Sequence, residues 1–175
     1  NNILQKETKP KYKFVNSKKD FEKVLKEIEE RGVCAIDTET NSLNIEKADL
    51  VGISLCSNEN TSYYVPINHT TPDGSKKIEK QLEEKYVIIH INKICKNEAI
   101  LKIGQNIKYD IRILSKYGVT FNSIADTMLM SYAIDNGKYK HNLDDLSFNH
   151  LNHTTIKYKE VVGSGTVSYT HLRAH

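Results

Sequence analysis

In this 175-residue chain, the stretch Ala35-Ile36-Asp37-Thr38-Glu39-Thr40 is the one around which we expect the rest to be arranged. The largely apolar residues 33–36 run into two carboxylates that are separated by a single residue. Because side chains alternate along a β-strand, Asp37 and Glu39 project from the same face. Two neighbouring carboxylates repel each other, so one is pushed toward its protonated form unless a cation lies between them. The pair therefore indicates either two solvated acids at a strand end or an oxygen-ligand site for Mg²⁺ or Mn²⁺.

The composition is typical of a water-soluble globular protein with one domain and a real core. No run approaches the length of a membrane helix and no signal-peptide pattern opens the chain, so we expect no membrane partner. The formal charge of +3 permits a nucleic-acid partner but does not demonstrate one. Cys34, Cys56 and Cys95 form no C-x-x-C pair, which favours buried free thiols in a reducing compartment over disulfides or zinc.

The first part of the chain predicts a linker, a helix and the strand that carries the acidic pair. Residues 1–13 are polar and lysine-rich and are expected to form a linker, with a short strand near residues 12–15. Ser17 and Asp20 mark a helix start, and Gly32 is placed to end the same helix. Apolar residues at helical spacing lie between them, so this helix is expected to pack against a core.

Beyond the acidic pair, the pattern predicts strands over residues 50–56 and 62–67, joined by a polar turn. Three consecutive strands indicate an antiparallel meander. A helix is expected over about residues 75–84, with residues 86–94 as its continuation. Residues 99–103 predict another strand, closed by Gly104 and joining beside the strand of Asp37.

Asp110 lies on the first turns of a helix that follows Gly104. Ile107, Ile111 and Leu114 share one face of this helix. A carboxylate is tolerated near phosphate at a helix N-terminus, where the macrodipole is positive. Asp110 is therefore either a site residue or an ordinary exposed helix acid.

Two further helix starts follow. Asp126 is expected to be an N-cap without a catalytic role, and Asn142 with Asp145 marks the second start. His141, directly before Asn142, is expected to be a surface histidine, with contact to a substrate phosphate as the alternative. After Gly163-Ser164-Gly165, residues 166–175 show no periodicity and resemble one reading frame of a transposon-type sequencing adapter. We expect this string to be a non-native tail, with natural sequence ending near residues 163–165.

Six motifs together resemble the 3′→5′ proofreading exonuclease domain of bacterial DNA polymerase I, in the superfamily with four acidic metal ligands. They are Ala35-Ile36-Asp37-Thr38-Glu39-Thr40-Asn41-Ser42-Leu43, Ala48-Asp49-Leu50-Val51-Gly52-Ile53-Ser54-Leu55, Tyr64-Val65-Pro66-Ile67, Leu101-Lys102-Ile103-Gly104-Gln105-Asn106-Ile107-Lys108-Tyr109-Asp110, Asp126-Thr127-Met128-Leu129 and His141-Asn142-Leu143-Asp144. The resemblance covers about residues 13–163. It implies an α/β fold with a ribonuclease-H-like mixed sheet, an antiparallel three-strand meander plus parallel strands, flanked by helices. Residues 14–165 would form this domain, incomplete at its C-terminal end.

The resemblance also implies a metal-dependent mechanism and a substrate. Asp37, Glu39 and Asp110 would hold two divalent cations, Mg²⁺ or Mn²⁺, with Asp37 bridging both. The 3′-terminal nucleotide of single-stranded DNA would contact Thr40 and Leu43. The single-strand groove would be lined by Gln105, Asn106 and Tyr109. A polymerase domain in the same parent chain and the bacterial cytoplasm are expected as partner and location.

The last motif of the family, a Tyr followed four residues later by an Asp, does not precede the adapter-like string. Tyr169 is followed by Arg173, which cannot ligate a cation. We therefore expect this fragment to be inactive, whereas the intact parent would trim 3′ ends. An exoribonuclease of the ribonuclease D type and a non-catalytic nucleic-acid-binding module remain the alternatives.

Overall fold

The computed structural model describes residues 11–71 and 74–156, and within these residues six strands form one mixed sheet. The strand order is β1-β4-β3-β2-β5-β6. The strands are β1 (Lys11–Phe14), β2 (Val33–Thr40), β3 (Leu50–Asn58), β4 (Thr61–Pro66), β5 (Leu101–Gly104) and β6 (Ile124–Asp126). The three strands β2, β3 and β4 pair antiparallel, and β1, β5 and β6 join their neighbours in parallel. The predicted meander with added parallel strands is confirmed, including the place of β5 beside β2.

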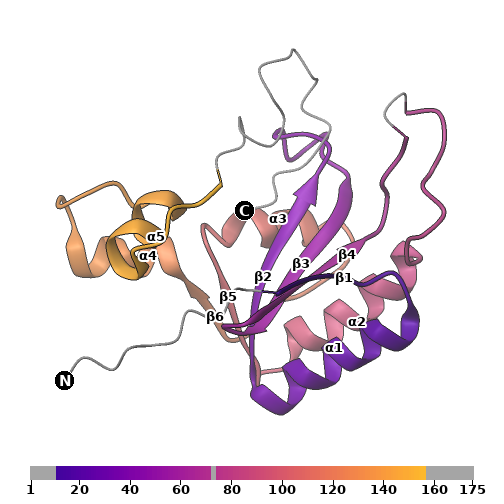
Figure 1. The fold of residues 1–175 in the computed structure, drawn as a ribbon, viewed down its shortest axis with the longest axis horizontal. Helices are drawn as coiled ribbons and strands as arrows, with labels where there is room; N and C mark the ends of the chain where they lie inside the picture. Colours follow the sequence, from indigo (N-terminus) through magenta and orange to yellow (C-terminus); the bar gives the residue numbers. More distant parts are fainter. Residues whose placement is uncertain (1–10, 72–73, 157–175) are drawn as a thin grey trace.

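Two helices, α1 (Lys18–Arg31) and α2 (Glu84–Lys96), lie side by side across one face of the sheet (Figure 1). The ends of α1 follow the predicted signals. Ser17 Oγ accepts the N–H of Asp20, and Gly32 takes the left-handed conformation with φ 65°. The buried residues of α1 are Phe21, Val24, Leu25 and Ile28. This apolar stripe packs into the main core, so the helix serves stability and not chemistry.

The helix expected over residues 75–84 is absent, and that prediction is wrong. Residues 74–83 contain only bends and an isolated bridge between Thr70 and Lys77, and α2 begins at Glu84. Leu82 is the only buried residue among residues 74–83. One buried side chain leaves no apolar face against which a helix could pack, and most helical stability in proteins comes from such packing. The continuation over residues 86–94 is confirmed as part of α2.

Three shorter helices complete the described chain: α3 (Lys108–Ser115), α4 (Thr127–Asp135) and α5 (Leu143–Leu151). Figure 1 shows α4 and α5 beyond the β6 edge of the sheet, while α3 lies near β2. Asp126 and Asn142 are the N-caps of α4 and α5, as predicted. Within the described ranges, no helix has the length and apolar character to cross a membrane. The expected linker and adapter-like tail lie largely outside these ranges, although β1 already begins at Lys11.

Candidate active site

The acidic pair lies at the edge where three parallel strands end. Strands β2, β5 and β6 are neighbours and run in the same direction, so their carboxyl ends share one edge of the sheet. On β2, Asp37 lies opposite Ser54 and Glu39 lies opposite Gly52. The pairing of β2 with β5 ends at Ala35, so the two strands diverge just before Asp37. In sheets of this kind, ligands bind in the crevice outside the carboxyl ends of the strands.

Asp110 reaches this edge from the first turn of α3 and contacts the residue between the two acids. Its Oδ1 accepts hydrogen bonds from the backbone N–H of Thr38 at 2.8 Å and from the Thr38 hydroxyl at 2.6 Å. The side chain of Asp110 is only 2% exposed, so it is not an ordinary exposed helix acid. Residues 72 positions apart are thereby joined, and Asp110 lies beside the Asp37-Thr38-Glu39 segment.

The ionisation of Asp110 is governed by opposing effects. Burial raises the pKa of this carboxyl group above its ordinary value of 3.8. The hydrogen bonds from Thr38 stabilise the charged form and lower the pKa, and the nearby charge of Asp126 raises it again. Burial prevails, so without a cation the protein favours the neutral acid more than water does.

Glu39 is also buried, with 2% of its surface exposed, and its neighbours come from β3 and β4. The phenol of Tyr64 lies where a side chain on Gly52 would stand: a Cβ atom at Gly52 would be 2.0 Å from the Tyr64 hydroxyl oxygen. Tyr64 also hydrogen-bonds His69 Nε2 at 2.6 Å. Burial raises the pKa of Tyr64, and the charge of Glu39 adds to that shift. A glycine at position 52 therefore lets this ring lie close to the acidic pair.

Thr40 and Tyr109, two residues expected to contact substrate, lie together. Their hydroxyl oxygens are 2.9 Å apart, and the carbonyl oxygen of Ser42 lies 2.9 Å from Thr40 Oγ1 and 3.2 Å from the Tyr109 hydroxyl oxygen. One hydroxyl can therefore donate to the other while the second donates to the carbonyl. These bonds fix the start of the loop after β2. The next residue, Leu43, is 54% exposed. A solvent-facing apolar side chain thus stands beside a hydrogen-bonded pair of hydroxyls.

Gln105 and Asn106 lie in the turn between β5 and α3, and they differ in how their side chains are engaged. The Gln105 amide is held on both sides, since Thr127 Oγ1 donates to its Oε1 at 2.5 Å and its Nε2 donates to the carbonyl oxygen of His141 at 2.8 Å. Asn106 has a left-handed backbone with φ 57°. Among the residues that the structure describes, its side-chain Oδ1 is buried and has no hydrogen-bond partner. Buried polar atoms are normally satisfied, so Asn106 offers an acceptor to a bound group.

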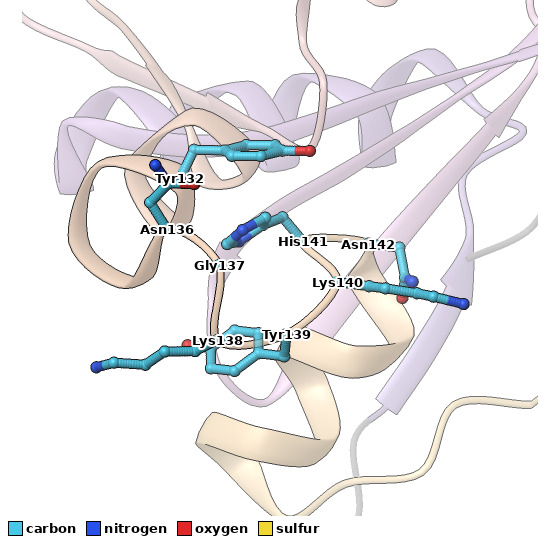
Figure 2. A pocket seen from close by; sticks show the side chains of 8 residues that line it. All are labelled: Tyr132, Asn136, Gly137, Lys138, Tyr139, Lys140, His141 and Asn142. Carbon is cyan, nitrogen blue, oxygen red and sulfur yellow. The ribbon is translucent and has the colours of Figure 1, made fainter.

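His141 is buried, so the expectation of a surface histidine is wrong. It is 6% exposed, and its Nδ1 lies 2.7 Å from the hydroxyl of Ser131. Figure 2 shows its ring between those of Tyr132 and Tyr139, with centroids 3.8 and 5.7 Å away. Tyr132, Tyr139 and His141 line an open pocket of about 630 Å³ that is formed by α4 and the loop joining it to α5. Aromatic packing and one hydroxyl contact account for the burial, and neither is visible in the local sequence.

The structure brings some of the predicted residues into direct contact. It joins Tyr109 to Thr40, and it joins Asp110 to Thr38, the residue between the two predicted acids. Among the residues that the structure describes, no group of three or more His, Cys, Asp or Glu side chains is arranged to hold a metal ion. The convergence of Asp37, Glu39 and Asp110 on shared cations therefore stays a prediction.

A family model described as 3′-5′ exonuclease matches residues 12–172. The chain belongs to this 3′-5′ exonuclease family. The match also runs through part of the segment expected to be a non-native tail, whose origin stays a prediction.

Curated relatives of this exonuclease chain carry the name DNA polymerase I. The protein from Rhizobium leguminosarum is 38% identical over 152 residues, which are 79% of this chain and 15% of that protein. The protein from Pseudomonas aeruginosa is 32% identical over 162 residues, 91% of this chain and 17% of that protein. The chain thus spans about one sixth of the length of these relatives.

Among solved structures, Brucella melitensis NrnC with bound Mg²⁺ matches the exonuclease chain with a TM-score of 0.62 and 18% identity. The match covers 90% of this chain and 69% of that one. At this identity the likeness shows a shared fold, and it agrees with the ribonuclease-H-like architecture expected from the sequence.

Sequence reasoning missed two residues of this candidate site. In the sequence Thr38 is only the spacer between two acids, although its hydroxyl holds Asp110. The contact joins positions 38 and 110, and no local pattern predicts it. The sequence shows Tyr64 only as part of a motif. A glycine inside a strand, such as Gly52, indicates that a large group packs against that position, and here this group is the ring of Tyr64.

Proposed function

We propose that this chain is a proofreading domain that hydrolyses the 3′-terminal phosphodiester of single-stranded DNA with divalent cations, within a family A DNA polymerase. One observation carries the proposal: the buried carboxyl group of Asp110 is hydrogen-bonded by Thr38. Thr38 is the residue between Asp37 and Glu39, near the carboxyl end of β2. Burying carboxylates is costly unless cations or hydrogen bonds compensate. Membership of the exonuclease family gives the reaction class, and the DNA polymerase I relatives favour DNA as the substrate.

The residues of this edge suit Mg²⁺ or Mn²⁺. Carboxylate oxygens are the ligands that these hard cations prefer, and Glu39 and Asp110 are both buried beside the exposed edge. In this proposal Asp37, Glu39 and Asp110 would hold the two cations. The cations would supply an activated hydroxide and charge stabilisation for the leaving oxygen. Thr38 keeps the Asp110 carboxylate in place through its two hydrogen bonds.

The residues around the edge would orient the DNA strand. Leu43 would pack against the terminal base, because it is exposed next to Thr40. The unsatisfied Oδ1 of Asn106 would accept a hydrogen bond from the strand. Tyr109 would line the groove while its hydroxyl holds Thr40. Gln105 would contribute mainly through the turn that it supports, since both ends of its amide are engaged.

We further propose that a polymerase domain follows in the parent chain, as the name and the length of the relatives suggest. The fourth acid and the Tyr that orients the attacking water would then come from the natural downstream sequence of that parent. For the 175-residue chain alone we propose no activity. A chain continued by its natural downstream sequence, called the extended chain below, should be active.

The test follows the fate of 5′-labelled oligonucleotides on the extended chain with Mg²⁺. The proposal expects a ladder of products shortened one nucleotide at a time from the 3′ end of single-stranded DNA. RNA should be trimmed much more slowly than DNA of the same sequence. Faster trimming of RNA would favour the exoribonuclease alternative, and binding without cleavage of either strand would favour the non-catalytic module.

A further inference from the structure

The carboxylate of Asp126 binds two separate segments of the backbone. At the start of α4 it accepts the N–H groups of Met128 at 2.9 Å and Leu129 at 3.4 Å, which is the expected cap. Across the sheet edge it also accepts the N–H groups of Asn106 at 3.0 Å and Ile107 at 3.1 Å. Asp126 itself is 9% exposed. A cap for α4 needs only the first pair, so the second pair calls for its own explanation.

The turn before α3 has no cap of its own. The residue at the N-cap position is Ile107, which cannot accept a hydrogen bond through its side chain, and Asn106 stands in the left-handed region. The first N–H groups of a helix have no partner within the helix and must find one elsewhere. For the N–H groups of Asn106 and Ile107, directly before α3, the partner is the carboxylate of Asp126, which follows Asn106 by 20 residues in the sequence.

Further contacts tie the same turn to β5, β6 and α4. The hydroxyl of Thr127 donates to the carbonyl oxygen of Gly104 at 3.2 Å and to the Gln105 side chain. A Cβ atom on Gly104 would stand 2.8 Å from the Cβ atom of Ile107, so the turn packs directly on the end of β5. Gly104 also pairs with Asp126 in the β5–β6 register. The turn therefore has one well-defined position.

That position sets where α3 begins, and Asp110 follows Ile107 by three residues. The N–H of Ile111 donates to the carbonyl oxygen of Ile107 at 2.9 Å, so the clamped residue is part of the first helical turn. The Asp110 carboxylate then meets Thr38 at 2.6 and 2.8 Å. A tilt of the helix start would shift this carboxylate relative to β2.

We propose that Asp126 is a positioning residue: its carboxylate fixes the turn from which α3 holds Asp110 against Thr38. This inference rests on the proposed function, because it gives Asp126 a part in cleavage through Asp110. A residue that only caps α4 could lose its bond to Ile107 without an effect on the reaction. The positioning role predicts that loss of this one bond impairs the reaction.

The two oxygens of Asp126 allow these roles to be separated. Oδ1 accepts from Asn106, Met128 and Leu129, whereas Oδ2 accepts only from Ile107. In Asp126→Asn, the amide oxygen can keep the three bonds of Oδ1, and the NH₂ group then faces the N–H of Ile107, donor against donor. The cap of α4 and the bond to Asn106 are retained, and the bond to Ile107 at the start of α3 is lost. Asp126→Ala removes both and serves as the severe case.

The matched control is Ser17→Ala. Ser17 caps α1 by accepting the Asp20 N–H at 3.2 Å and donates its hydroxyl to Asp20 Oδ2 at 2.7 Å, and α1 lies beside α2 on one face of the sheet (Figure 1). The variant loses one helix cap, as Asp126→Asn loses one bond, without touching α3. A general loss of stability would affect both variants alike.

The experiment measures kcat and KM for a single-stranded oligonucleotide, the Mg²⁺ concentration for half-maximal rate, and amide hydrogen exchange at Thr38, all on the extended chain. We expect Asp126→Asn to lower kcat about ten- to a hundredfold, as small displacements of catalytic groups do. KM should stay within about twofold, more Mg²⁺ should be needed, and the Thr38 amide should exchange faster. Ser17→Ala should leave all of these readouts close to those of the parent.

The proposal is overturned if Asp126→Asn keeps kcat and Thr38 exchange within about twofold of the parent, or if Ser17→Ala reproduces its effects. If the proposed function is wrong, the result is different, because the Asp37→Ala variant then remains active. The exchange rate of the Thr38 amide still reports in that case whether Asp126 positions Asp110. If Asp126→Ala does not fold, Asp126→Asn alone decides the question.

Discussion

Replacing Thr38 by Val should destabilise the chain most strongly where Asp110 is ionised. The Thr38 hydroxyl donates to Asp110 Oδ1 over 2.6 Å, and both side chains are buried. Valine has nearly the same shape but cannot donate, while the backbone N–H at position 38 still can, at 2.8 Å. The lost bond is therefore one hydrogen bond to a buried carboxylate.

The size of the effect follows from the charge on the acceptor. A hydrogen bond to a charged group contributes about 1.5–3 kcal/mol, and a neutral one about 0.5–1.5 kcal/mol. We expect Thr38→Val to lower the free energy of unfolding by about 2 kcal/mol when Asp110 is charged and by about 1 kcal/mol when it is protonated.

The sign of the pH dependence is fixed by the raised pKa of Asp110 in the folded state. Between the ordinary pKa and the raised one, the native state binds more protons than the unfolded state, so stability falls as pH rises through that interval. Removing the hydroxyl raises the pKa further and extends this interval upward. The difference between Thr38→Val and the parent should therefore grow with pH.

Urea unfolding followed by circular dichroism, in EDTA at acid and at mildly alkaline pH, measures this difference. Thr38→Ser keeps a hydroxyl and is the matched control, expected to retain most of the stability at both pH values. The prediction is wrong if Thr38→Val lowers the free energy of unfolding equally at both pH values. It is also wrong if Thr38→Ser lowers it as much as Thr38→Val does.

Three further predictions follow from the described residues. Gly52→Ala should lower the free energy of unfolding by about 1–3 kcal/mol, because the added methyl group overpacks against Tyr64. Thermal unfolding should show a much smaller loss in a Tyr64→Leu background, and an equal loss in both backgrounds would contradict the contact. Burial raises the pKa of Cys34 and of Cys95 to about 12, so native alkylation followed by mass spectrometry should label Cys56 and spare the other two until the chain unfolds. If native Cys34 were labelled to the same extent as Cys56, this prediction would be wrong. The 175-residue chain alone should leave labelled single-stranded DNA intact, and Asp37-dependent trimming by it would show that the site closes without a further acid.

Local patterns in the sequence were sufficient for the framework of the fold. The apolar run before Asp37 and the two strands after it form the antiparallel meander, because alternation and turn residues are local signals. Ser17 and Gly32 bound α1 as predicted for the same reason. The short strand β6 was missed, since three residues carry too little pattern to predict a strand.

The site was predicted less completely, because its contacts join distant segments. The sequence places Asp110 on a helix start but leaves open whether it is exposed, and its bonds to Thr38 settle that it is buried. His141 was misjudged because its burial depends on Tyr132 and Ser131 from α4. Asp126 is recognisable as a cap of α4, but its bonds to the turn before α3 depend on β5 and β6 lying side by side.

Cleavage of 5′-labelled single-stranded DNA by the extended chain, compared with its Asp37→Ala variant, tests the central claim most directly. Both proteins should give the same circular dichroism spectrum, since Asp37 is a partly exposed side chain on β2. With Mg²⁺ the parent should trim the strand stepwise from its 3′ end, EDTA should abolish this trimming, and the variant should trim nothing at any Mg²⁺ concentration. An Asp37→Ala variant that trims DNA at close to the parent rate would contradict the assignment of this acidic edge as the active site.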